Sequence, residues 1–166
     1  MLAAQLFDGQ RQNYYAIVLS RLLYGMESLA LCASDKRKLD GFHAKCCRSI
    51  AHISASYISR VSNKFVFKTL DVKPMSETLL KRQLQFFGAI ARKSDEDVIR
   101  KMVFKPSSCD KVTAGTRKTG RPRINWKQQL FNHAWTIAGN TPLPDIVLDK
   151  DAWGAAVRQY CDALNT

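Results

Sequence analysis

Apolar residues recur every three or four positions along most of the chain, which is the period of an amphipathic α-helix. This pattern predicts helices over 10–33, 36–53, a short segment after Ser62, 76–93, 96–104, Pro122 to Ile137, and 149–164. No stretch of useful length alternates apolar and polar residues in the manner of a half-buried strand. The sequence therefore predicts an all-α fold, a compact bundle of about six to seven helices with a basic loop before the penultimate helix.

The expected organisation is one helical body, because 166 residues make about one domain. Residues 1–104 are predicted to form a helical domain. Residues 105–121 lack helical periodicity and are rich in Ser, Thr, Gly, Lys and Arg, which indicates a flexible basic loop. Residues 122–166 are predicted to form a C-terminal pair of helices that packs on the same body.

Two of the predicted helices carry cations opposite their apolar faces. In helix 36–53 the apolar stripe comprises Leu39, Phe42, Cys46, Ile50 and Ile53. The far side of that helix carries Lys38, Lys45, Arg48 and His52, and the outer side of helix 76–93 carries Lys81 and Arg82. Two interpretations stay open for these faces: an ordinary solvated helix surface, or a ridge of cations for a phosphate backbone.

The net charge of +12, from 26 basic and 14 acidic residues, favours the second interpretation. Residues 106–127 alone carry +5, whereas residues 128–166 carry −2, so the positive charge lies in the middle of the chain. A basic surface of this kind faces a polyanion, and nucleic acid is the usual one. We therefore expect nucleic-acid contact outside the last helix.

The densest group of cations lies in the segment Gly115–Leu130. It comprises Arg117, Lys118, Arg121, Arg123 and Lys127. Pro122 suits the first turn of a helix, and Trp126 begins an apolar stripe that continues through Leu130. We expect the basic residues to bind phosphates while Trp126 acts as a structural anchor in the core, rather than as a base-stacking residue.

The sequence contains none of the common catalytic or metal-binding motifs that we searched for. His43, Cys46 and Cys47 could meet on one helix, but they lack the paired spacing of zinc sites, so we expect small buried residues there and no metal. The chain holds no GxSxG nucleophile motif and no GxxxxGK[ST] phosphate loop. Its acids are scattered, apart from Asp95, Glu96 and Asp97, which we expect to form a cluster at the start of a helix. We therefore expect no catalytic residue and no cofactor.

The cysteines and the apolar N-terminal segment bear on the compartment. Five cysteines, two of them adjacent, are typical of reduced intracellular thiols and not of a disulfide framework. Residues 14–33 are apolar, but Arg21 and Glu27 interrupt them, which favours a buried helix over a membrane span. No targeting signal is evident, so we expect an intracellular protein, in the nucleus or the cytoplasm, that contacts no membrane.

Five pieces of the sequence, in this order, resemble one known family. They are LLYGMESLAL (22–31), KLDGFHAKCCRSI (38–50), ISRVSNKFVFKTL (58–70), LLKRQLQFFGAIARK (79–93) and GTRKTGRPRINW (115–126). Together they resemble the region after the polymerase core in reverse transcriptases of LINE-type, non-LTR retrotransposons. The chain departs from the family's pattern at Leu29, where the family has Trp, and at Phe86–Ala89, where it has WLGH.

The resemblance implies the thumb and post-thumb region, with residues 1–104 as the thumb-like domain. The family's polymerising carboxylates lie in an upstream palm, in a motif like [FY]ADD that is not present in this sequence. The resemblance therefore implies a chain that is not an enzyme by itself and that grips RNA, DNA or a hybrid, mainly through the backbone, beside an upstream palm if it is part of a longer protein. Two alternatives remain: a helical protein-interaction module, and an independent DNA-binding factor.

Overall fold

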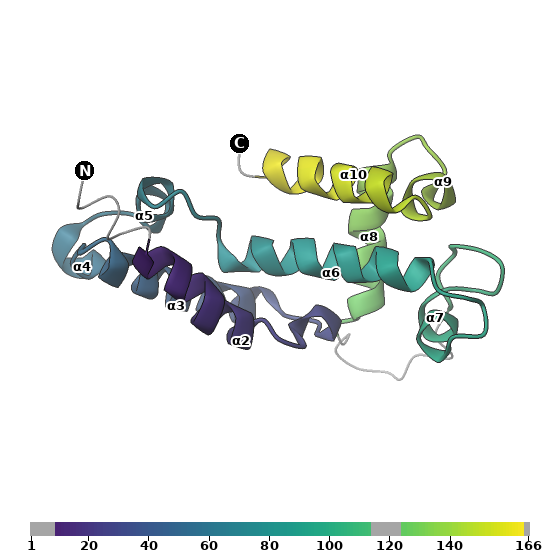
Figure 1. Cartoon of the computed structure of the whole chain (residues 1–166), viewed down its shortest axis with the longest axis horizontal. Helices are drawn as coiled ribbons and strands as arrows, with labels where there is room; N and C mark the ends of the chain where they lie inside the picture. The colour runs from purple at the N-terminus through teal and green to yellow at the C-terminus, as the bar shows by residue number, and fades with distance from the viewer. Residues whose placement is uncertain (1–8, 114–123, 165–166) are drawn as a thin grey trace. The chain divides into compact units, whose positions relative to one another are not determined.

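The computed structural model describes residues 9–113 and 124–164. The fold is all-α, as predicted: within those residues the only strand-like pairing is an isolated bridge between Phe104 and Lys111. In chain order the elements are the π-helical turn η1 (Tyr14–Leu19), α2 (Ser20–Leu22), the 3₁₀ turn η2 (Met26–Ser28), α3 (Ala33–Ile50), α4 (Ser56–Ser59), α5 (Asn63–Thr69), α6 (Met75–Ala91), α7 (Val98–Val103), α8 (Trp126–Ala138), α9 (Leu143–Val147) and α10 (Lys150–Ala163) (Figure 1).

The chain divides into two units. Unit 1 comprises Met1–Glu27 and Leu31–Leu79, and unit 2 comprises Ser28–Ala30 and Leu80–Thr166. The boundary between Leu79 and Leu80 lies inside α6, so α6 contributes its first residues to unit 1 and the others to unit 2. The division therefore cuts through the segment 1–104 that we expected to form one domain.

The first helix ends earlier than the predicted range of 10–33. Its last helical residue is Leu22, and the chain then turns through Gly25, whose φ of +72° lies in the left-handed region that suits glycine. The π-helical turn places Tyr14 and Leu19, five residues apart, on the buried side. Regular α-helical spacing of the predicted helix places Tyr15 on its apolar face with Leu19, but the π-helical turn leaves Tyr15 exposed.

Helix α3 buries more than its apolar stripe. Leu39, Cys46 and Ile50 are partly buried, as predicted, but the fully buried residues are His43, Ala44, Cys47 and Arg48. Phe42, which we expected to face inward, is exposed. The inward face is wider than the apolar stripe, because a histidine and an arginine lie inside unit 1.

Helix-capping preferences in the sequence favour Ser34 or Asp35 as the N-cap of α3, Ser62 for α5 and Ser76 for α6. The N-cap of α3 is instead Cys32, whose sulfur accepts from Asp35 N at 3.3 Å while the Asp35 carboxylate accepts from Cys32 N at 3.3 Å. Ser62 caps α5 as predicted, since its hydroxyl accepts from Phe65 N at 3.2 Å. Ser76, expected to cap α6, lies inside that helix, and its backbone N–H donates to Asp40 of α3 at 2.8 Å.

Unit 2 closes around aromatic side chains from three helices and one connector. The ring centre of Phe87 on α6 lies 5.0 Å from those of Phe104 and Phe131 and 6.1 Å from that of Trp153. The indole N–H of Trp153 donates to Leu84 O at 2.9 Å, which ties α10 to α6. In Figure 1, α8 crosses α6 and leads through α9 into α10, which returns alongside α6.

The apolar periodicity of the helices in unit 2 predicts their inward faces, which include Leu84, Phe87, Ala91, Leu130, Ala134, Trp153, Val157, Tyr160 or Cys161, and Leu164. The structure confirms most of these positions. The buried residues include Leu84, Phe87 and Ala91 of α6, Leu130 and Ala134 of α8, and Trp153, Val157 and Cys161 of α10. Leu164 is the exception, because it is exposed at the end of α10. None of the helices in the described parts of the chain combines the length and the apolar character needed to cross a bilayer.

Candidate nucleic-acid interface

Lys38 and Lys45 lie on the outward side of α3, and both are exposed. They are seven residues apart, which places them two turns apart and about 10 Å along the helix axis. Neither lysine forms an ion pair with another described residue. Both ammonium groups therefore remain available to an anionic ligand.

Few acids lie near these lysines: Asp35 and Asp40 flank Lys38, and no further acid follows until after Leu70. From Gly41 to Leu70 the chain has no Asp or Glu, while Lys45, Arg60, Lys64 and Lys68 are exposed cations. The nearest carboxylate after Lys38 in the sequence is that of Asp40. It accepts hydrogen bonds from the backbone N–H and the hydroxyl of Ser76, at 2.8 and 2.7 Å. The surface of unit 1 is thus cationic over thirty consecutive residues.

Arg48, predicted on the same exposed face, lies elsewhere, and that prediction is wrong. Its side chain is only 6% exposed, and Nη1 donates to Ser54 O at 3.2 Å and to the Ser59 hydroxyl at 3.3 Å. Nη2 donates to Val61 O and, at 3.1 Å, to Asn63 Oδ1. Both terminal nitrogens of the guanidinium therefore hold the connector from α3 through α4 to α5, and the side chain is buried away from the exposed lysines' solvent-facing side.

His43 is the second polar group inside unit 1. Nε2 must be the protonated nitrogen, because its partner at 3.1 Å is the carbonyl of Lys73, which can only accept. Nδ1 then accepts from the Tyr14 hydroxyl at 2.8 Å. The imidazole also stacks between Tyr14 and Phe67, at 5.6 and 5.2 Å, and burial lowers its pKa, so the neutral ring is the stable form.

These contacts decide whether His43, Cys46 and Cys47 can bind a metal ion. Both nitrogens of His43 are already used within unit 1, so the ring has no lone pair free for a metal. Burial raises the pKa of the Cys47 thiol to about 11, which keeps the sulfur protonated rather than in the thiolate form that binds metals. His43 and Cys47 therefore pack in the core of unit 1, where His43 is hydrogen-bonded to Tyr14 and to Lys73 O.

The other predicted cations belong to unit 2 or lie outside the described residues. Lys81 and Arg82 are half-buried on α6, and Lys127 of α8 donates to Met102 O at 3.0 Å. Arg117, Lys118, Arg121 and Arg123 lie outside the described residues. The structure therefore brings together Lys38 and Lys45 on one helix face, and it places Lys81, Arg82 and Lys127 in the other unit.

Trp126 lies where an anchor is expected. It is partly buried against the core of unit 2, with its ring centre 6.1 Å from that of Phe86 in an edge-on arrangement. Helix α8 begins at Trp126, because the side chain of Asn125 caps it by accepting from Lys127 N at 3.0 Å. This start lies four residues beyond Pro122, where the sequence placed the first turn.

A mostly apolar hollow of about 550 Å³ lies beside Trp126 in unit 2. Its lining residues are Ser28, Phe86, Ile90, Ile99, Met102, Val103, Trp126 and Lys127. Ile99 and Met102 are exposed at its rim. Periodicity along the chain does not predict this hollow, since its walls come from three helices and a turn that are distant in the sequence.

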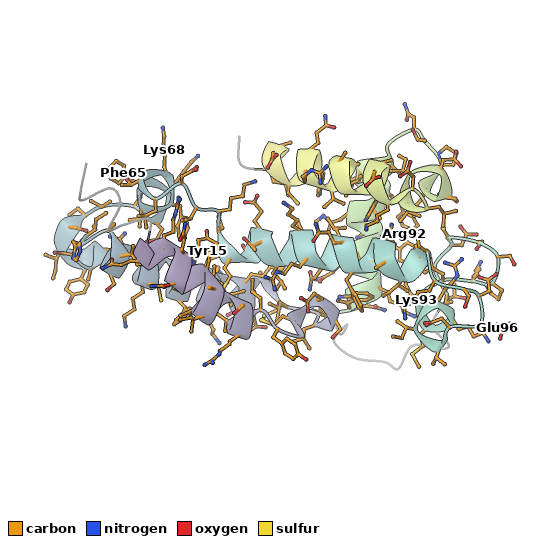
Figure 2. The ribbon with its side chains drawn as sticks, viewed as in Figure 1. Tyr15, Phe65, Lys68, Arg92, Lys93 and Glu96 are labelled. Atoms are coloured by element: carbon orange, nitrogen blue, oxygen red, sulfur yellow. The ribbon has the colours of Figure 1, made fainter. Side chains whose placement is uncertain are left out.

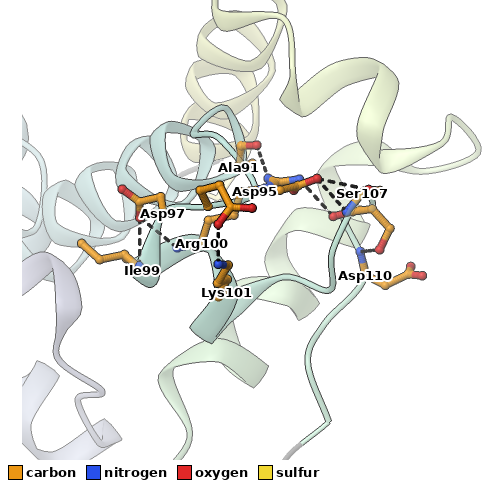
Figure 3. Close-up of polar contacts among 10 residues, drawn as sticks. Ala91, Asp95, Asp97, Ile99, Arg100, Lys101, Ser107 and Asp110 are labelled. Carbon is orange, nitrogen blue, oxygen red and sulfur yellow. Dashed lines mark hydrogen bonds and ion pairs between the residues drawn. The ribbon is translucent and has the colours of Figure 1, made fainter.

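The cations of residues 93–101 are already matched by acids. Lys93 pairs with Asp97 at 2.8 Å, and Lys101 pairs with Glu96 at 2.9 Å. Arg100 is buried, with Nε on Asp95 at 2.8 Å and Nη1 on Ala91 O, as Figure 3 shows. This group therefore stabilises the start of α7 and adds little to a phosphate-binding surface.

Comparison with models of protein families, with curated proteins and with solved structures finds no match for this chain.

Proposed function

We propose that this chain is a nucleic-acid-binding thumb and post-thumb portion of a retroelement reverse transcriptase. In this role it grips a template–primer duplex and relies on an upstream palm for the polymerising carboxylates. The proposal is supported by the order of the five sequence pieces. The single observation that carries nucleic-acid binding is the pair of exposed lysines on α3, Lys38 and Lys45, the second of which lies in a stretch that has no acid, from Gly41 to Leu70.

The grip works through charge and spacing. Cations placed along a rigid helix fix the position of a phosphate backbone without reading the base sequence. Lys38 and Lys45 act in this way on α3, Lys81 and Arg82 add to it on α6, and the basic segment supplies Arg117, Lys118, Arg121 and Arg123. Arg48 acts indirectly, by holding the connector that follows α3.

Anisotropy titrations of labelled duplex DNA and RNA–DNA hybrid, at several salt concentrations, test the proposal. Each phosphate neutralised on B-DNA adds about 0.9 to the slope of log K against log salt, so a slope of several units is expected. Replacing Arg117, Lys118, Arg121 and Arg123 with Ala lowers that slope. A flat salt dependence of the wild-type chain contradicts the proposal, as does an unchanged slope in the fourfold variant.

A second candidate function is a helical protein-interaction module, which the apolar hollow beside Trp126 favours. Concave apolar surfaces with exposed rim residues such as Ile99 and Met102 are typical of protein docking sites. This function predicts a protein partner that is lost when Met102 is changed to Asp, and no nucleic acid that co-purifies. The ratio of absorbance at 260 and 280 nm of the purified chain separates the two functions.

A further inference from the structure

Two aromatic side chains on α4 and α5 are exposed without a structural need. Tyr57 on α4 is 78% exposed and Phe65 on α5 is 56% exposed. Helix α5 holds its place in unit 1 through Val66, with Leu70 at its C-cap, so Phe65 contributes little to the core. An exposed phenylalanine of this kind marks an interaction surface when other features around it select a ligand.

The features around Phe65 are cationic. Lys64 directly precedes Phe65. Lys68 follows Phe65 by three residues and Lys64 by four, so Lys68 lies on the same side of α5 as each of them. Both lysines are exposed, neither forms an ion pair with a described residue, and Arg60 is also exposed. Figure 2 shows the side chains of Phe65 and Lys68 projecting outward from α5. Charge complementarity therefore selects an anionic ligand that also carries flat apolar faces.

The α4–α5 segment is held in one conformation. Arg48 donates to Ser54 O, the Ser59 hydroxyl, Val61 O and Asn63 Oδ1, so one buried guanidinium fixes both ends of α4 and the start of α5. Ser62 caps α5, and the connector residue Arg60 adopts a left-handed φ of +55°. A fixed segment loses little conformational entropy when it binds a ligand.

We propose that α4 and α5 form a binding site for single-stranded nucleic acid, with unpaired bases stacked on Phe65 and Tyr57 and phosphates on Lys64 and Lys68. The site needs unpaired bases because a duplex buries the base faces that a ring must contact. Aromatic rings between cations along the strand are the usual means of binding single strands without sequence preference. This inference rests on the proposed function in taking nucleic acid as the ligand, and it adds a second, strand-specific site to the lysines proposed to bind a duplex.

The test compares a labelled single-stranded oligonucleotide with a labelled hybrid duplex, using the full chain and anisotropy at several salt concentrations. Phe65→Ala and Tyr57→Ala are each expected to weaken single-strand binding by about fivefold to a hundredfold. Neither change alters the salt slope or the affinity for the duplex. Lys64→Ala with Lys68→Ala lowers the single-strand slope by about 1.4, because each phosphate on a single strand contributes about 0.7.

Two further variants serve as controls. Tyr24→Ala removes an aromatic ring that is 87% exposed in the same unit but stands outside α4 and α5, and it leaves single-strand affinity unchanged. Phe65→Trp keeps a stacking ring and retains single-strand affinity, which separates stacking from a change in folding. Circular dichroism of each variant verifies that helix content is preserved.

The outcomes separate this inference from the proposed function. Salt-dependent duplex binding, together with single-strand binding that Phe65→Ala and Tyr57→Ala leave unchanged, overturns the inference and leaves the proposed function standing. Equal losses for single strand and duplex also overturn it. Failure of the wild-type chain to bind the duplex, with single-strand binding that depends on Phe65, overturns the duplex grip and keeps the site. Binding of an acidic peptide through Phe65, without any single-strand binding, overturns the inference in favour of a protein ligand.

Discussion

Unit 2 closes around four aromatic rings, whereas unit 1 closes around a histidine and an arginine. The rings of Phe87, Phe104, Phe131 and Trp153 form one continuous cluster, with a single polar link from the indole N–H of Trp153. In unit 1 the apolar residues form two smaller clusters, and the buried His43 and Arg48 bind backbone carbonyls of the same unit. Unit 2 is thus stabilised mainly by burial, and unit 1 depends more on hydrogen bonds that only one geometry satisfies.

The difference also decides which cations remain on the surface. In unit 2, Lys93, Lys101 and Arg100 are matched by neighbouring carboxylates. In unit 1 the one buried cation, Arg48, is matched by carbonyl and amide oxygens, so that segment needs no acid near it. The exposed lysines around Arg48 therefore keep their charge available for a ligand.

The largest expected effect tests the aromatic core. Trp153→Ala removes a fully buried ring and the hydrogen bond to Leu84 O, and it is expected to lower the free energy of unfolding by about 3–5 kcal/mol. Urea unfolding gives the size of the loss, and hydrogen exchange locates it in Leu80–Thr166. A loss below about 1 kcal/mol, or one confined to unit 1, contradicts a core built on these rings.

The next effect tests the polar core. Arg48→Met keeps most of the side-chain volume but removes the guanidinium donors to Val61 O and Asn63 Oδ1, which is expected to cost about 2–3 kcal/mol in unit 1. Arg48→Lys recovers only part of this, because one ammonium cannot span the two sides that the planar guanidinium reaches. Equal stability of the Met variant and the wild type contradicts a stabilising role for the hydrogen bonds of Arg48. Hydrogen exchange across 54–63 provides the local readout.

Two glycines inside helices give a matched pair. A Cβ at Gly88 on α6 would lie 2.4 Å from Cδ1 and Nε1 of Trp153, so Gly88→Ala is expected to destabilise unit 2 by about 1–3 kcal/mol. Gly41 on α3 has nothing within 4 Å of a Cβ, so Gly41→Ala is expected to stabilise unit 1 by about 0.5–1 kcal/mol. Opposite signs in thermal unfolding support the packing described for each unit, and equal signs contradict it.

The smallest effect is a pH dependence in unit 1. Burial lowers the pKa of His43 in the folded chain, so the unfolded chain takes up a proton first as the pH falls below about 6.5. The stability that the neutral ring provides is fully present above that pH and is lost below it, by up to about 1.4 kcal/mol per pH unit until the folded pKa is reached. His43→Gln removes this dependence while keeping an amide that can both donate and accept. Urea unfolding at several pH values from 7.5 to about 5 measures it, and equal pH slopes in the variant and the wild type contradict it.

Sequence periodicity predicted unit 2 far better than unit 1, for a physical reason. Where Leu, Phe, Trp and Val fill the inward face, as at Leu84, Phe87 and Trp153, the apolar stripe and the buried face coincide. Where polar residues are buried, as at His43 and Arg48, the stripe identifies only part of that face. The early end of the first helix depends on a π-helical turn and on the φ of Gly25, neither of which apolar spacing encodes.

The candidate site was predictable to a similar degree. The exposed positions of Lys38 and Lys45 follow from helical spacing alone, because no buried partner competes for them. Arg48 lies in the last turn of the same helix, where carbonyl groups of the following connector accept its hydrogen bonds. A pattern of charges along the helix does not show whether a cation binds such carbonyls or stays in solvent. The exposure of Phe65 was likewise hidden, since periodicity treats every phenylalanine as a core residue.

The salt dependence of duplex binding, measured for two charge-matched double variants, tests the nucleic-acid grip most directly. Lys38→Ala with Lys45→Ala removes two unpaired lysines of unit 1, and Lys93→Ala with Lys101→Ala removes two lysines of unit 2 that are paired with acids. The first pair is expected to lower the slope of log K against log salt by about 1.8 for B-DNA, whereas the second pair leaves it nearly unchanged. Equal slopes for the two double variants would contradict a grip built on the exposed lysines of α3.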